Sequence, residues 1–293
     1  MSTVSDNDII VSVCANCGKE DANNICNKCT TVKYCNAACK KKHRHKHKKQ
    51  CEEYHRLAAK RAAELHDKEL FKQPPQLYGD CQICFLRIPT LATGWRYQSC
   101  CGKVICSGCI HAPVYDNQGN EVDKHKCPFC RTPTPTSYEE MIERLKKREH
   151  LDDPFAVFHI GMYYARGEYG FPQDVDKALE IWHRSGELGF HNAYNNIGYA
   201  YDNGLGVKVD EKKANHYYEL SAMGGDEEAR NNLGNNELRA DNASRALKHY
   251  MISVRVGCAD SLTGHFALFQ RLTQMRKELK DLGKEWRQMM LWQ

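Results

Sequence analysis

Five pairs of cysteines, each with two residues between its members, limit how the first half of this chain can fold. Fifteen of the sixteen cysteines lie before residue 131 in a sequence of 293 residues. Two thiolates separated by a tight turn can occupy two corners of one tetrahedron around a zinc ion. A disulfide framework does not require this spacing and belongs to oxidising compartments. The sequence therefore predicts zinc sites at the pairs Cys14/Cys17, Cys26/Cys29, Cys81/Cys84, Cys106/Cys109 and Cys127/Cys130.

Composition and charge exclude several other classes of protein. The chain has 42 Lys and Arg against 37 Asp and Glu, a net charge of +5, which is too small for a polybasic nucleic-acid coat. No stretch approaches the ~18 apolar residues that a membrane span needs, and the N-terminus lacks the pattern of a secretory signal. We therefore expect a location in the cytoplasm, the nucleus or both, with no membrane association. The sequence contains no recognisable catalytic motif, so no catalytic residue is predicted.

The first cysteine block, residues 14–51, contains seven cysteines and one suitably placed histidine. Eight ligands complete two tetrahedral zinc shells and leave no position for water, which indicates structural sites and not hydrolytic ones. His47 stands four residues before Cys51, so the two side chains lie on one face of a helix. His43 and His45 do not share that spacing, and we expect both to be solvated.

This order of ligands resembles a MYND-type zinc finger, and Tyr34 immediately before Cys35 strengthens the resemblance. MYND fingers are peptide-binding modules, often for short proline-containing motifs, so the resemblance implies protein or peptide partners. The tryptophan common three residues before the ligand histidine is replaced here by Arg44, which affects the peptide platform and not the metal fold. The resemblance implies one zinc held by Cys14, Cys17, Cys35 and Cys39 and a second held by Cys26, Cys29, His47 and Cys51.

Residues 40–50 are strongly basic, with seven Lys or Arg and three His. Such a run could be a nuclear-import signal or a nucleic-acid patch. We favour the solvated face of the finger's last helix, because no row of aromatic residues accompanies the run for base stacking. Nucleic acid is therefore retained only as a weak partner.

The second cysteine block, residues 81–130, contains eight cysteines, again enough for two closed tetrahedra. Its spacing resembles a RING-type finger in which Lys103 stands where most RING fingers have a histidine. A protonated lysine cannot act as a ligand, so the adjacent Cys100 and Cys101 take part instead, as in all-cysteine variants. The alternatives for one of these two positions are His111 and His125. The resemblance implies one zinc on Cys81, Cys84, Cys106 and Cys109 and another on Cys100, Cys101, Cys127 and Cys130.

A RING-type finger implies a ubiquitin ligase, which recruits a ubiquitin-conjugating enzyme and contributes positioning without covalent chemistry. By resemblance, Ile83 and Pro128 correspond to the apolar contact residues for that enzyme, and Arg131 to the basic residue that bridges enzyme and ubiquitin. The alternative is that Ile83 and Pro128 only shape the metal-binding turns. In that case the chain is a non-catalytic scaffold or a nuclear adaptor.

From residue 153 onward the chain repeats an Ala, Ile-Gly, Lys-Ala, Trp/Tyr, Gly pattern, with a first period of 36–37 residues and a shorter second one. A period in this range is typical of helix pairs stacked into a solenoid. The pattern resembles the Sel-one-like (Sel1) repeats, relatives of the tetratricopeptide class, which implies a protein-binding scaffold that could recruit substrates. We expect helix caps at Asp153, Asp174 and Asp210 and helix ends at Gly189, Gly225 and Gly257.

The predicted fold class is two small zinc-stabilised α+β fingers, both cross-brace modules, followed by an all-α helical-repeat solenoid. Each finger is too small to be stable on its own hydrophobic core, so four structural zinc ions should be required for folding. The expected segments are a MYND-like finger at 14–51, a helical linker at 52–76, a RING-like finger at 77–136, a connecting helix at 137–152, Sel-one-like repeats at 153–262 and a C-terminal helix at 263–293.

The C-terminal helix has apolar residues at heptad spacing from Leu272 to Met289, interrupted by Gly283. This pattern favours a lid on the last repeat and leaves a dimerising coiled coil as the alternative. The choice between monomer and dimer stays open.

Overall fold

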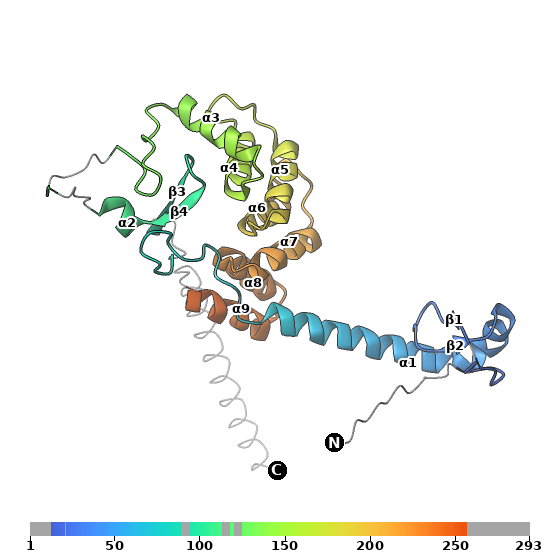
Figure 1. Ribbon diagram of the computed structural model, residues 1–293. Helices are drawn as coiled ribbons and strands as arrows, with labels where there is room; N and C mark the ends of the chain where they lie inside the picture. Colours follow the sequence, from blue (N-terminus) through green and yellow to red (C-terminus); the bar gives the residue numbers. More distant parts are fainter. Residues whose placement is uncertain (1–12, 21, 89–93, 113–117, 120–124, 257–293) are drawn as a thin grey trace, which may run out of the picture. The chain divides into compact units, whose positions relative to one another are not determined.

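The computed structural model describes residues 13–20, 22–88, 94–112, 118–119 and 125–256 (Figure 1). The chain forms two compact units that divide between Glu69 and Leu70. None of the helices in the described ranges is both long and apolar enough to cross a membrane. The expected helix at 263–293 and the end of the third repeat, including Gly257, lie outside the described residues.

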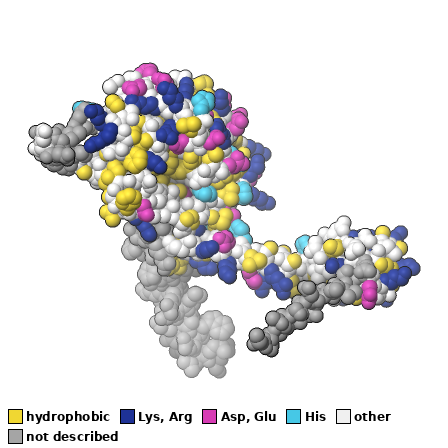
Figure 2. All heavy atoms as spheres, in the orientation of Figure 1, with side chains coloured by type: hydrophobic (Ala, Val, Ile, Leu, Met, Phe, Trp, Pro, Cys, Tyr) yellow, Lys and Arg dark blue, Asp and Glu magenta, His cyan; other side chains and the backbone are white. Residues whose placement is uncertain are grey.

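The N-terminal unit consists of a short hairpin and most of a long helix. Strand β1 (Asn24–Ile25) pairs in antiparallel register with β2 (Lys33–Tyr34). Helix α1 (Ala37–Leu70) begins inside the finger and continues without a break through most of the segment expected to be a linker. Residues with high helix propensity fill this stretch, and the first prolines come only at 74 and 75. Lys and Arg side chains are prominent on the surface of this unit (Figure 2).

The second cysteine module, at the start of the second unit, is built on a hairpin and a short helix. Strand β3 (Trp95–Gln98) pairs antiparallel with β4 (Lys103–Cys106), and α2 (Ser107–His111) follows directly. The turn between the two strands contains Cys100 and Cys101, so the hairpin carries two of the predicted ligands at its tip.

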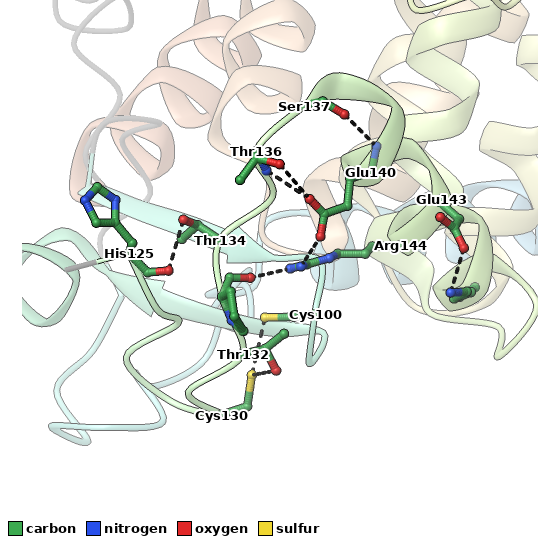
Figure 3. Close-up of polar contacts among 12 residues, drawn as sticks. Cys100, His125, Cys130, Thr132, Thr134, Thr136, Ser137, Glu140, Glu143 and Arg144 are labelled. Carbon is green, nitrogen blue, oxygen red and sulfur yellow. Dashed lines mark hydrogen bonds and ion pairs between the residues drawn. The ribbon is translucent and has the colours of Figure 1, made fainter. Parts of the chain in front are cut away.

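Helix α3 (Tyr138–Glu149) follows the last cysteine pair and is fastened to the module. The Ser137 hydroxyl accepts a hydrogen bond from the backbone N–H of Glu140 at 3.3 Å and so caps the helix. Arg144, one turn later, donates to the Pro133 carbonyl at 2.8 Å and to the Glu140 carboxylate (Figure 3). The chain leaving the second cysteine module is therefore held against α3.

The repeat region forms stacked helix pairs, which confirms the predicted solenoid. Asp153, Asp174 and Asp210 cap helices through side-chain hydrogen bonds, as predicted. Gly189 and Gly225 follow the ends of two helices, each with a φ of +102°. The pairs are α4 (Pro154–Arg166) with α5 (Val175–Glu187), α6 (Asn192–Asn203) with α7 (Glu211–Met223), and α8 (Glu227–Arg239) with α9 (Ala243–Val256).

A glycine in the first helix of each pair lets an aromatic ring of the second helix pack against the backbone. A Cβ atom on any of these glycines would lie 2.5–2.7 Å from the ring. Real Cβ atoms do not approach that closely, so each aromatic ring can pack in this position only because its partner residue is glycine. The contacts are Gly161 with Trp182, Gly198 with Tyr218, and Gly234 with Tyr250.

The second cysteine module packs on the first repeat through Tyr97 on β3. The Tyr97 ring stacks on Phe155 with centroids 5.1 Å apart and an interplanar angle of 6°. Its hydroxyl donates to Oδ2 of Asp153 at 2.8 Å, while Oδ1 of the same carboxylate caps α4. Asp153 therefore stabilises both the start of the solenoid and the attachment of the module. The burial of Tyr97 in this contact raises the pKa of its hydroxyl above the usual range.

Residues 70–78, here called the strap, lie along the repeats although their composition is that of a linker. Leu70 is fully buried among side chains of α7 and α8. The buried Arg230 guanidinium donates to the Leu70 carbonyl, which lies at the C-terminal end of α1, where cations are favoured. The ring contacts of the strap include Phe71 with His249 (4.7 Å), Tyr78 with Trp95 (4.3 Å) and Tyr78 with Phe155 (6.0 Å).

We predict that Gly225→Ala destabilises the protein more than Gly189→Ala. Both glycines have φ +102° and occupy equivalent places in successive repeats, so both substitutions carry the same backbone strain. A Cβ at Gly189 meets nothing within 4 Å, whereas one at Gly225 lies 2.3 Å from the Pro75 carbonyl oxygen of the strap. The additional loss for Gly225→Ala should be about 1–3 kcal/mol, measured by urea and thermal unfolding. Equal losses for the two variants would show that the strap does not lie there.

Candidate metal centres

The structure brings the sixteen predicted ligands together in four groups. Within each group the ligand atoms all lie within 4.8 Å of one another. The groups are the same as those implied by the two family resemblances, and neither His111 nor His125 belongs to any group found among the described residues. The four tetrads are Cys14, Cys17, Cys35 and Cys39; Cys26, Cys29, His47 and Cys51; Cys81, Cys84, Cys106 and Cys109; and Cys100, Cys101, Cys127 and Cys130.

The distances within the tetrads fit zinc and exclude disulfides. Four thiolates at about 2.3 Å from a central zinc are about 3.8 Å apart, whereas a disulfide bond is about 2.05 Å long. Sulfur–sulfur distances of 3.5 Å for Cys35 and Cys39 and 3.7 Å for Cys84 and Cys106 are close to the tetrahedral value. All fifteen cysteines in the described part of the chain are free thiols. Each tetrad is therefore consistent with one structural zinc ion.

Four of the five cysteine pairs form the same type of turn. In each, the residue after the second cysteine donates its backbone N–H to the carbonyl of the first cysteine at 2.8–2.9 Å. That residue has a left-handed φ of 54° to 75°, a conformation that side chains other than glycine adopt at a cost. This backbone conformation directs both thiols of the pair toward one point. The residues with left-handed φ are Gly18, Thr30, Phe85 and Arg131.

The fifth pair lies at the beginning of a helix. Cys106 is the N-cap of α2, and its sulfur accepts a hydrogen bond from the backbone N–H of Cys109 at 3.4 Å. Burial and a hydrogen bond shared with Cys84 raise the pKa of the Cys109 thiol above its usual range. The geometry of this pair differs from the other four, yet it also directs both sulfurs toward one tetrad.

In each tetrad the pKa of one thiol is lowered and the pKa of at least one other is raised. Burial opposes ionisation of Cys14, but hydrogen bonds from nearby backbone N–H groups lower its pKa to about 6. Its neighbour Cys35 has a pKa raised to about 12, because its thiol shares hydrogen bonds with Cys39 and Cys17. Clustered thiolates repel one another, and a divalent cation removes that repulsion. The thiols with a pKa of about 6, one in each tetrad, are Cys14, Cys26, Cys81 and Cys130.

His43 supports the second tetrad from outside, contrary to the expectation that it is solvated. Its Nδ1 lies 3.2 Å from the Tyr34 hydroxyl, and its ring stacks on His47 with centroids 5.9 Å apart. His43 is one helical turn before His47, so the sequence does contain a signal for this contact. The Nε2 atom of His47 faces the tetrad, 3.4 Å from the sulfur of Cys29. His45 is exposed, as expected.

The adjacent Cys100 and Cys101 both take part in the fourth tetrad. The Cys100 sulfur lies 3.3 Å from that of Cys130, and the Cys101 sulfur 3.9 Å from that of Cys127. The tight turn after β3 makes this possible, because the N–H groups of residues 101 and 102 both bond to the Gln98 carbonyl. The Cys130 sulfur also contacts the Thr132 hydroxyl at 3.2 Å (Figure 3).

The predicted contact residues of the second module are accessible to different degrees. Ile83 is 37% exposed and Arg131 is exposed, whereas Pro128 is half-buried. Three further apolar side chains near the metal-binding turns are exposed, which the sequence did not single out. They are Phe85 (77%), Leu86 (69%) and Phe129 (43%).

Two of the modules expected from the sequence match known protein families. Residues 14–51 match the family model of the MYND finger, and residues 154–190 and 191–226 each match the Sel1 repeat. A comparison with curated proteins found no significant match. The chain therefore carries a MYND finger and Sel1 repeats, with a second cysteine-rich module between them.

Solved structures of repeat proteins resemble part of the chain. A Sel1 repeat protein from Oxalobacter formigenes is 30% identical, with a TM-score of 0.42; the match covers 44% of this chain and 54% of that one. A protective antigen of uropathogenic Escherichia coli with an SLR fold is 23% identical, with a TM-score of 0.40 and coverages of 44% and 28%. Cysteine-rich protein B of Helicobacter pylori is 24% identical, with a TM-score of 0.34 and coverages of 42% and 95%.

We predict a content of four zinc ions per chain, one for each tetrad. Cys100→Ser should lower the content to three, because serine is a poor zinc ligand at neutral pH. His111→Ala and His125→Ala should leave it at four, since neither histidine belongs to a tetrad. Elemental analysis of purified variants measures the content. A loss of zinc in either histidine variant would show that Cys100 and Cys101 do not both bind.

We also predict that acidification releases zinc. One thiol of each tetrad has a pKa lowered to about 6, well below the ordinary value for a cysteine, so the fold favours its ionised form. The stability that such a thiol contributes is present at high pH and is lost as the pH falls through about 6. Zinc should therefore stay bound at neutral pH and be released below about pH 6. We expect unfolding to follow the release of zinc. A zinc-sensitive dye measures the release and circular dichroism measures the unfolding. Unfolding that precedes zinc release would contradict this order.

Proposed function

We propose that this protein is a ubiquitin ligase whose second cysteine module binds a ubiquitin-conjugating enzyme, and whose MYND finger and Sel1 repeats recruit protein substrates. The observation that carries this proposal is the interleaving of the third and fourth tetrads. The first cysteine pair of the module shares a tetrad with Cys106 and Cys109, and the adjacent pair between them shares the other tetrad with Cys127 and Cys130. This cross-braced order is typical of RING-type fingers.

A module of this kind can contribute surface and positioning but no reaction centre. Each tetrad supplies four protein ligands, so a bound zinc has no position left for water or substrate. Zinc would therefore act as a structural ion there. Restraining two reacting partners in a productive orientation accelerates transfer without covalent participation of the protein.

The surface around the metal-binding turns is suited to a protein partner. Ile83 and Phe85 project from the first turn and Phe129 from the last, and all three are exposed. Exposed apolar side chains gathered in one small module are typical of interaction sites. Arg131 adds a positive charge directly after the last cysteine. In the proposal, the apolar residues contact the conjugating enzyme and Arg131 contacts the ubiquitin that it carries.

Substrate recruitment rests on the two modules that the comparisons matched. MYND fingers and Sel1 repeats both imply protein–protein interactions. The strap covers one edge of the repeats, so a partner would contact other surfaces of the solenoid. Exposed apolar side chains of the second repeat offer such a surface, namely Tyr199 (51%), Leu205 (48%) and Val209 (54%).

A second candidate function is a non-catalytic interaction scaffold. It is favoured by the same two modules, since neither needs a transfer reaction to act. In this case the second cysteine module would serve as a further docking surface.

We predict that the zinc-loaded protein forms polyubiquitin chains with at least one member of a panel of conjugating enzymes. Ile83→Ala should reduce the rate by about tenfold or more, because truncating an apolar residue at the centre of an interface removes much of the binding energy. Arg131→Gly should do the same by removing the charge, and glycine keeps the left-handed backbone at this position (φ 62°).

The matched controls are Leu65→Ala on α1 and Arg166→Ala in the repeats, which truncate an exposed leucine and an exposed arginine. Both should retain the wild-type rate and zinc content. An inactive wild-type protein across a broad panel would favour the scaffold. Equal effects of the control variants would show that Ile83 and Arg131 have no special role.

A further inference from the structure

A groove in the N-terminal unit has a strongly unbalanced charge. It has a volume of about 760 Å³ and lies between α1 and the residues that follow β1. Its base is formed by ligands of the second tetrad and by Tyr34. One carboxylate, Glu52, lines it, against five lysine and arginine side chains. The cations are Lys28, Lys40, Lys41, Arg44 and Lys48.

Three of these cations lie on one face of α1. Lys40, Arg44 and Lys48 are four residues apart, so each follows the previous one after about one helical turn. Like charges at this spacing repel each other. Within the described residues, neither Arg44 nor Lys48 forms an ion pair with a carboxylate. Glu52, four residues after Lys48, is the one carboxylate among the described residues that line the groove, so the row of cations is only partly balanced.

Lys40 blocks one way in which a peptide could bind beside the hairpin. Its Nζ donates to the Ile25 carbonyl and to the Asn27 side-chain oxygen, both at 2.8 Å. A peptide that extended the hairpin as a further strand would pair with backbone groups at the edge of β1, and this carbonyl is already bonded. Recognition in this groove therefore depends on charge more than on strand pairing.

We propose that the groove binds acidic peptide segments of partner proteins. This inference rests on the proposed recruiting role of the MYND finger and names the chemistry of the segment that it recruits. Carboxylates of such a segment would pair with the unpaired cations and with Lys40. Nucleic acid fits less well, because Tyr34, the one Phe, Tyr or Trp residue among the described residues that line the groove, is only 1% exposed and cannot stack on a base.

The test is selection of a random peptide library on the zinc-loaded full-length protein. We expect zinc-dependent enrichment of peptides rich in Asp and Glu. The affinity of a selected peptide should fall about tenfold for Arg44→Glu/Lys48→Glu, since two attractive contacts become repulsive. The matched control is Lys42→Glu/Lys46→Glu, which makes the same change in net charge at the same spacing on α1, at residues that do not line the groove. It should change the affinity less than threefold or so.

Each result decides the proposal. Enrichment of peptides that lack acidic residues but depend on Arg44 and Lys48 would overturn the acidic preference and leave peptide recruitment in place. An absence of any zinc-dependent enrichment would remove peptide recruitment as well. Equal losses in the two double variants would show that total charge and not the groove attracts the peptide. Tighter binding of a single-stranded DNA oligonucleotide that is lost only in Arg44→Glu/Lys48→Glu would assign the groove to nucleic acid. The ubiquitin-transfer assay tests the ligase proposal separately.

Discussion

The mutual repulsion of clustered thiolates, and its relief by a divalent cation, determines whether the first half of this chain folds. Among the described residues of the MYND finger, the buried apolar cluster is largely sulfur: Cys14, Cys26, Cys29 and Cys51 lie with Tyr34 and Ala22. Such a cluster is too small to stabilise a fold by hydrophobic burial. Structural zinc can supply about 10–16 kcal/mol of apparent binding energy, comparable with the whole stability of an ordinary domain. The metal therefore takes the place of a hydrophobic core.

In the second unit the fourth tetrad is connected to the repeats by backbone and side-chain contacts. The turn that presents Cys100 and Cys101 is continuous with β3, and β3 carries Tyr97, which packs on Phe155 and bonds to Asp153. Arg148 of α3 also donates to the Cys100 carbonyl at 3.3 Å. A change in the fourth tetrad would therefore disturb residues that begin the solenoid. The glycine and aromatic contacts within the helix pairs are local by comparison and need no metal.

The parts of the structure that the sequence predicted are those in which spacing alone carries the information. Ligand intervals, the repeat period and the capping aspartates each depend on residues close together in the chain. The strap did not have such a signal: Gln73 to Gln76 reads as a linker, and the burial of Leu70 depends on helices more than 140 residues later. For His43 the spacing to His47 was a usable signal, but its contact with Tyr34 was not, because that contact requires the hairpin to lie against α1. The unbroken length of α1 was also not anticipated. The finger motif ends at residue 51, but residues with high helix propensity continue beyond it, so the helix does not end there.

The two cysteine modules share one way of folding but present different chemistry to partners. Both use the same metal-binding turn, but the side chains between and after the ligands differ between the two modules. In the second module those positions hold Ile83, Phe85 and Phe129, whose apolar side chains are exposed. In the MYND finger the corresponding turns are polar, and the exposed face of α1 holds Lys and Arg. An apolar surface and a cationic one do not compete for the same partner. One chain with both is therefore suited to hold two different proteins at the same time, which is what a ligase or a scaffold requires.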